Sequence, residues 1–116
     1  MDDYAEGHKE FVLNQLSNLT ESELVFLLII SSEYIEAKNK HPNWPTDEIH
    51  QTAIVQEEAG EMIRAALNYK YEGARYSEIH KEAVQTAAMG LRFLVEASQR
   101  NRKPLIIDHF NGGSNE

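Results

Sequence analysis

The 116-residue sequence contains no cysteine, so the protein can form no disulfide bond, no thiolate zinc site and no cysteine nucleophile. This absence is consistent with the cytoplasm, where we expect the protein to be located. Long apolar runs are also missing, because the longest covers only residues 24–30, too short to span a bilayer. The segment Met1-Asp2-Asp3-Tyr4 has neither a basic region nor an apolar core, so we expect no signal peptide.

Positive charge is scarce. The chain has 11 Lys and Arg residues against 19 Asp and Glu residues, which gives a net charge of −8. Nucleic acids and anionic membranes both require a basic surface, so we expect neither as a partner. A polyanionic ligand would need a metal ion to bridge like charges. The 41% hydrophobic and 26% charged content is ordinary for one globular domain, here residues 1–116 with a core at about 20–101.

Proline is limited to three residues, and two of them, Pro42 and Pro45, flank the only tryptophan. Each proline favours extended backbone in the residue before it, so a helix should stop at this point. The first interpretation of Trp44 is a loop anchor that folds back on the core. The alternative is an aromatic wall for a nucleobase or another flat ligand.

The remaining pattern predicts an all-α, antiparallel four-helix bundle-like domain. Thr20 and Glu23 have the spacing of a capping box, Thr46 or Asp47 can cap the third helix, and Gly73 can end it. The predicted helices cover residues 3–17, 20–38, 47–71 and 77–100. An apolar tail follows at 104–110, and residues 111–116 are expected to be disordered.

Apolar spacing predicts which helix faces are buried. Residues 24–30 are apolar all round, so we expect them to be buried on several sides, whereas Glu33 and Glu36 should face solvent or a cleft. Small residues on the fourth helix, such as Ala87, Ala88 and Gly90, permit close approach of another helix in the monomer or in a dimer. On the third helix the predicted core stripe comprises Val55, Ala59, Met62 and Ala66, widened by Ile63 and Leu67.

Acidic residues on two neighbouring helices have matching spacing. Glu58 and Glu61 are three apart and point the same way, and their repulsion calls for a compensating partner. Counting outward from Gly73 in an antiparallel hairpin places Glu82 and Gln85 at similar heights to this pair. Four oxygen-bearing side chains can therefore converge, and an all-oxygen set suits Mg²⁺ or Mn²⁺ rather than zinc.

The segment Glu57-Glu58-Ala59-Gly60-Glu61, followed by Glu82-Ala83-Val84-Gln85, resembles the MazG-like all-α nucleoside triphosphate pyrophosphohydrolases, whose pattern is Glu-Glu-x-x-Glu and then Glu-x-x-Asp. The resemblance covers residues 41–97. It implies a Mg²⁺-dependent enzyme that cleaves a nucleoside triphosphate between its α and β phosphates, releasing a monophosphate and pyrophosphate. It also implies a homodimer or homotetramer.

The family's aspartate corresponds to Gln85, a departure from the pattern. An amide oxygen can still ligate Mg²⁺, but the site loses one negative charge. We therefore expect weaker metal affinity. Three alternatives remain open. The site could hold one metal ion, it could use a ligand set that includes Glu57, or it could bind nucleotide without turnover.

The roles implied for individual residues follow from this resemblance. The ligands of the metal would be Glu58, Glu61, Glu82 and Gln85. Glu57 or Glu58 would act as the general base. Basic side chains must complete phosphate binding. Trp44 and His50 are candidates for contact with the nucleobase of the substrate. For Asp47 and His50, one turn apart, we favour a surface hydrogen bond over a metal pair. The residues assigned to substrate are Trp44, His50, Lys81 and Arg92.

Two other classes compete with this interpretation. A non-catalytic dimeric helical module that retains a weakened cation or nucleotide site is favoured by Gln85. A di-iron carboxylate bundle is disfavoured, because neither acidic helix has the Glu-x-x-His pattern of such proteins. In the simplest alternative, the glutamates line only a solvated helix face.

Overall fold

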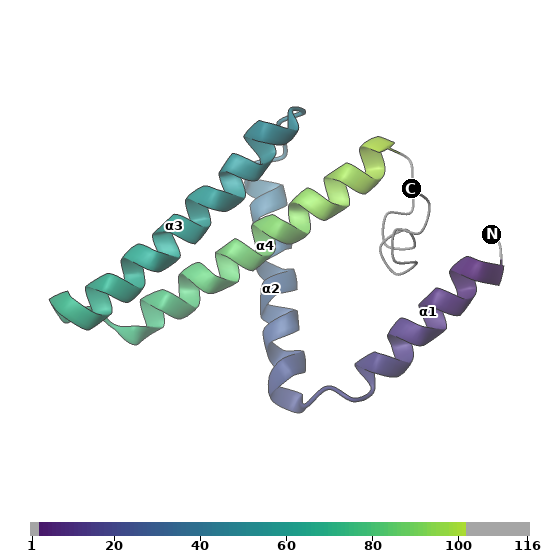
Figure 1. Cartoon of the computed structure of the whole chain (residues 1–116), viewed down its shortest axis with the longest axis horizontal. Coiled ribbons are helices and arrows are strands. Elements are labelled where there is room, and N and C mark those ends of the chain that lie inside the picture. The colour runs from purple at the N-terminus through teal and green to yellow at the C-terminus, as the bar shows by residue number, and fades with distance from the viewer. Residues whose placement is uncertain (1–2, 102–116) are drawn as a thin grey trace.

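The chain forms four α-helices in the computed structural model, which describes residues 3–101 and the side chains of residues 8–97 (Figure 1). Within residues 3–101 no strand occurs, so the predicted all-α class is confirmed. The helices are α1 (Asp3–Leu16), α2 (Glu21–Lys40), α3 (Glu48–Glu72) and α4 (Tyr76–Asn101). The predicted ends lie within about two residues of these bounds, the usual uncertainty of a helix end. The predictions for 104–110 and 111–116 fall outside the described residues.

The helix ends are set by local hydrogen bonds that the sequence predicts. At the start of α2, the Thr20 hydroxyl accepts a hydrogen bond from the Glu23 amide at 3.1 Å, and the Glu23 carboxylate accepts one from the Thr20 amide at 2.7 Å. Asp47 caps α3 by accepting a hydrogen bond from the His50 amide at 3.0 Å. Gly73 ends α3 with φ of 76°, a left-handed conformation that glycine adopts without strain.

The α3–α4 hairpin is the main packed unit. The two helices run antiparallel and pack along each other, and α2 crosses α4 on one side (Figure 1). By contrast, α1 extends away from the other three helices (Figure 1). Among the described hydrophobic residues only Ala65, which is 8% exposed, and Ala88, which is 0% exposed, are buried, so the core between these helices is narrow.

Two predictions about burial are wrong. Residues 24–30 were expected to be buried on several sides, but α2 contains no buried residue and Leu24 to Ile29 are 42–69% exposed. On α3, Ile63 and Leu67 are exposed instead of widening the core stripe. The physical reason is that α2 meets the hairpin at a crossing, and a crossing covers far less of a helix than antiparallel packing along its length.

No helix in the described part of the chain is both long and apolar enough to cross a membrane.

Candidate functional site

The predicted acidic cluster lies on α3 and α4, with a contribution from α2. Glu58 is partly buried in the middle of α3, and Glu82 is partly buried on the facing helix α4. Glu57 and Glu61 are exposed neighbours of Glu58 on α3. Glu33, from the polar half of α2, is close enough to act electrostatically on Glu58. Three helices therefore place carboxylates around one partly buried carboxyl group.

Glu58 is the electrostatic centre of this cluster. Burial raises the pKa of its carboxyl group, and the negative charges of Glu82, Glu57, Glu61 and Glu33 raise that pKa further, in that order. Repulsion by Glu82 exceeds that of either neighbour on α3, so the two helices bring their acids together as the hairpin spacing predicts. The contribution of Glu33 was not assigned from the sequence, because only the crossing of α2 over the hairpin places that residue here.

The other residues predicted for the cluster are differently placed. Gln85 is partly buried one turn after Glu82 on α4, whereas Lys81 is exposed beside Glu82. Glu61 lies 3.8 Å from Arg64 in an exposed ion pair, so its negative charge is partly offset by a neighbour on the same helix. As the side chains stand, no group of three or more His, Cys, Asp or Glu residues among the described residues could hold a metal ion.

Arg92 and Trp44 come together at the other end of α4. The Arg92 guanidinium lies 4.9 Å from the centre of the Trp44 ring and is only 2% exposed. Its Nη1 donates a 3.4 Å hydrogen bond to the Ala37 carbonyl at the end of α2, and its Nε lies 3.7 Å from the Glu96 carboxylate. Trp44 therefore folds back from the loop between α2 and α3 onto α4, which is the placement that the loop-anchor interpretation predicts.

Several N–H donors of Arg92 and Trp44 have no hydrogen-bond acceptor. Trp44 Nε1, Arg92 Nε and Arg92 Nη2 are buried without a hydrogen-bond acceptor. Arg92 follows Glu82 by ten positions, which corresponds to about 15 Å along the axis of α4. Two of the four residues assigned to substrate, Trp44 and Arg92, therefore lie together, about 15 Å along α4 from Glu82.

The loop between α2 and α3 is anchored by a residue that we did not single out in the sequence. Gln51 is 2% exposed and donates a 2.7 Å hydrogen bond from its side chain to the Pro45 carbonyl. Gln51 lies four residues before Val55, in line with the core stripe, and this spacing could have predicted its burial. The neighbouring His50 side chain is exposed, and the hydrogen bond between His50 and Asp47 uses the His50 amide rather than its ring.

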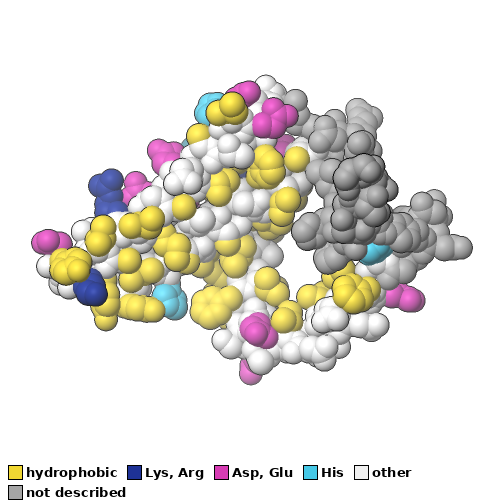
Figure 2. Space-filling view, in the orientation of Figure 1, with side chains coloured by type: hydrophobic (Ala, Val, Ile, Leu, Met, Phe, Trp, Pro, Cys, Tyr) yellow, Lys and Arg dark blue, Asp and Glu magenta, His cyan; other side chains and the backbone are white. Residues whose placement is uncertain are grey.

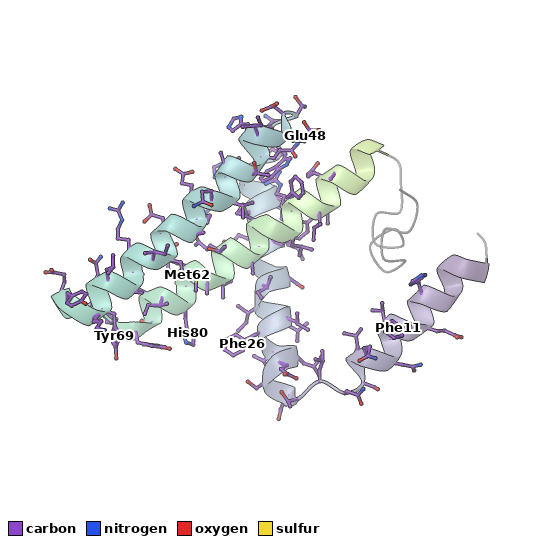
Figure 3. The ribbon with its side chains drawn as sticks, in the orientation of Figure 1. Phe11, Phe26, Glu48, Met62, Tyr69 and His80 are labelled. Atoms are coloured by element: carbon purple, nitrogen blue, oxygen red, sulfur yellow. The ribbon has the colours of Figure 1, made fainter. Side chains whose placement is uncertain are left out.

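An apolar hollow of about 380 Å³ lies where α2 meets the hairpin. Phe26, Met62 and His80, which come from α2, α3 and α4, are labelled around it in Figure 3. The His80 ring meets the edge of Phe26 at 6.1 Å and the Tyr76 ring at 5.3 Å, measured between ring centres. Neither the hollow nor its aromatic rim was predicted, because both depend on how α2 crosses the hairpin.

Comparison with known proteins assigns no family to the chain. No protein-family model, no curated protein and no solved structure matches it.

Proposed function

We propose that the protein is a cytoplasmic, Mg²⁺-dependent nucleoside triphosphate pyrophosphohydrolase of the MazG-like type, and that it works as a homodimer or homotetramer. The observation that carries this proposal is the placement of carboxylates from α2, α3 and α4 around Glu58, a partly buried carboxyl group whose pKa is raised first by burial and then by these acids. Such crowding of like charge has a cost, and a divalent cation would relieve it. The Glu-Glu-x-x-Glu and Glu-x-x-Gln spacing supports the same reaction through its resemblance to the family.

The donor chemistry of the cluster suits Mg²⁺. Glu58, Glu61, Glu82 and Gln85 offer only oxygen ligands, which hard cations prefer. When bound, the metal ion would neutralise charge that develops on the phosphate oxygens. Glu57 or Glu58 would orient the attacking water and accept its proton at a carboxylate oxygen. Lys81, which is exposed and next to Glu82 in the sequence, would contact a phosphate.

The test is product analysis with a panel of nucleoside triphosphates in the presence of Mg²⁺ or Mn²⁺. Monophosphate and pyrophosphate are measured separately from orthophosphate. We expect monophosphate and pyrophosphate in equal amounts, dependent on the metal. Orthophosphate release, or no product with any nucleotide, would contradict the proposal. Thermal unfolding with and without Mg²⁺ provides an independent readout, because an ion that binds only the native state raises the melting temperature.

Gln85→Asp is expected to strengthen metal binding by about 10-fold, because it adds a carboxylate one turn after Glu82. The measurement is the Mg²⁺ concentration that gives half of the maximal rise in melting temperature. The matched control is Gln99→Asp, which adds the same charge near the far end of α4. Equal midpoints for the wild type and Gln85→Asp would show that position 85 is not a ligand.

A non-catalytic dimeric helical module with a weakened cation or nucleotide site is the second candidate. One observation favours it: Gln85 replaces the acid that the resemblance requires. In that case Mg²⁺ or nucleotide would raise the melting temperature, and pyrophosphate would not be formed.

A further inference from the structure

The apolar hollow borders the acidic cluster on all three helices that form it. On each helix, one residue that lines the hollow is three or four positions from an acid of the cluster. These pairs are Ile30 and Glu33 on α2, Met62 and Glu58 on α3, and Ile79 and Glu82 on α4. Residues at this spacing share a helix face and lie about one turn, or 5.4 Å, apart along the axis. The hollow therefore begins about one helical turn from the proposed metal ligands.

The hollow has the size and the lining of a site for a flat ligand. Its volume of about 380 Å³ lies within the range of about 300–1,000 Å³ that small-molecule sites occupy. Figure 2 shows hydrophobic side chains gathered where α2 meets the hairpin. The His80 ring is inclined at 63° to Phe26 and at 58° to Tyr76, so these rings do not stack on one another. Phe26 is 43% exposed and Tyr76 is 56% exposed, which leaves ring surface open to a heteroaromatic ligand.

The hollow and the acidic cluster differ in charge as the two ends of a nucleotide do. Among the described residues that line the hollow, none is Asp or Glu. A nucleobase is uncharged, so an apolar, aromatic lining suits it. A triphosphate is strongly negative, and in a chain of net charge −8 it needs the metal ion at the cluster. One nucleotide can therefore place its base in the hollow and its phosphates at the cluster.

The alternative base contact, Trp44, lies on the other side of the cluster. It packs on Arg92, about 15 Å along α4 beyond Glu82, whereas Tyr76 and His80 precede Glu82 by one to two turns. A single sugar separates the base of a nucleotide from its α phosphate. The base must therefore bind close to the ligands of the metal, and the hollow is the closer of the two aromatic groups.

We infer that the hollow is the nucleobase site of the substrate, and that the base binds there against Phe26, Tyr76 and His80. The inference rests on the proposed function and adds to it the residues that hold the base. Among the described side chains that line the hollow, only those of Tyr76 and His80 form hydrogen bonds. The site therefore recognises a flat ring more than a particular hydrogen-bond pattern. We expect kcat/KM values for purine and pyrimidine triphosphates within about 10-fold of each other.

The experiment uses Phe26→Leu, which keeps an apolar side chain in the hollow and removes the ring. We expect KM for nucleoside triphosphates to rise about 10-fold, with kcat within about 2-fold of the wild type. Calorimetry with adenosine and cytidine monophosphate gives a readout without catalysis, and their dissociation constants should rise by the same factor. Inorganic tripolyphosphate has no base, so its inhibition constant should not change. The matched control is Phe11→Leu on α1, which extends away from the hollow and should behave as the wild type (Figure 1).

The outcomes separate the base site from the proposed reaction. Pyrophosphate release with an unchanged KM in Phe26→Leu would overturn the inference and leave the enzyme standing. Monophosphate binding that Phe26→Leu weakens, without pyrophosphate release, would support the base site and overturn the enzyme. If neither binding nor release is detected, both are wrong. Weaker tripolyphosphate inhibition in Phe26→Leu, or a preference above about 100-fold for one base, would overturn recognition by the rings.

A second variant covers the case in which Phe26→Leu does not fold. His80→Leu removes another ring of the hollow at an exposed position of α4, where the cost to folding should be small. The same rise in KM and in the monophosphate dissociation constants is expected. Unchanged values for a folded His80→Leu would contradict the inference in the same way.

Discussion

Glu58→Gln is expected to lower metal-dependent pyrophosphate release by about 100-fold or more while raising the melting temperature of the metal-free protein. The loss of activity follows from its proposed role, because Glu58 is both a metal ligand and a candidate base. The gain in stability follows from the cluster, because an amide removes a charge that burial and four neighbouring carboxylates disfavour. We expect a gain of about 0.5 kcal/mol, or roughly 2 °C, since these groups remain partly solvated.

The pH dependence has a definite sign. The pKa of Glu58 is higher in the folded chain than its ordinary value of 4.5, so the folded state holds this proton more tightly than the unfolded state. Stability from this group is therefore fully present below the unfolded pKa, and it is lost as pH rises through the folded pKa. Melting curves of the wild type should show this loss above pH 4.5, and Glu58→Gln should reduce it.

Two variants on the same helix separate the expected effects. Glu61→Gln should also reduce pyrophosphate release strongly, but without the gain in stability, because Glu61 is exposed and paired with Arg64 at 3.8 Å. Glu72→Gln, at the end of α3, should change neither property. If Glu58→Gln retained the activity of the wild type, the acidic cluster would not be the active site. If it lowered the metal-free melting temperature, the electrostatic account of Glu58 would be wrong.

Arg92→Ala is expected to destabilise the protein by about 2–4 kcal/mol, or roughly 8–15 °C in melting temperature. Arg92 is 2% exposed, and its side chain fills the space between the end of α2, the Trp44 ring and α4. Truncation would leave a cavity under Trp44 and remove the contact between the cation and the ring, which contributes about 1–2 kcal/mol when desolvated. Thermal and urea unfolding measure the loss.

Arg92→Met tests whether Arg92 acts through its volume or its charge. Methionine nearly keeps the volume and removes the two guanidinium nitrogens that lack an acceptor. Glu96 would lose its partner at 3.7 Å but is partly exposed, so the cost should be small. Methionine also loses the cation–ring contact and the hydrogen bond to the Ala37 carbonyl, but removal of the two unsatisfied donors offsets part of this loss. We therefore expect a destabilisation of about 1–2 kcal/mol, smaller than that of Arg92→Ala. A loss as large as that of Arg92→Ala would show that the charge is what stabilises this junction.

The same variant addresses the assignment of Arg92 to phosphate binding. Arg92 lies about ten positions beyond Glu82 and is closed off from solvent by Trp44. If its role is confined to packing, Arg92→Met should leave both kcat and KM within about 3-fold of the wild type. A large rise in KM with normal stability would instead support a direct contact with substrate.

The sequence by itself determined the helices, their ends and the pairing of the acidic residues. Capping at Thr20 and Asp47, and termination at Gly73, depend on hydrogen bonds and backbone conformations within a few residues, so local patterns suffice. The approach of Glu58 and Glu82 follows nearly as directly, because a short turn forces two long helices to run antiparallel. Counting residues from Gly73 then gives their relative heights.

Only the tertiary structure decided where α2 lies, and with it the features that the sequence did not predict. The crossing of α2 over α4 brings Glu33 toward Glu58, forms the apolar hollow beneath Phe26, and leaves Leu28 exposed. An apolar segment such as 24–30 indicates that a helix must be covered, but the covering can come from its own chain or from another. Burial depends on the angle and extent of contact between helices, and these distant relations are not encoded in local spacing.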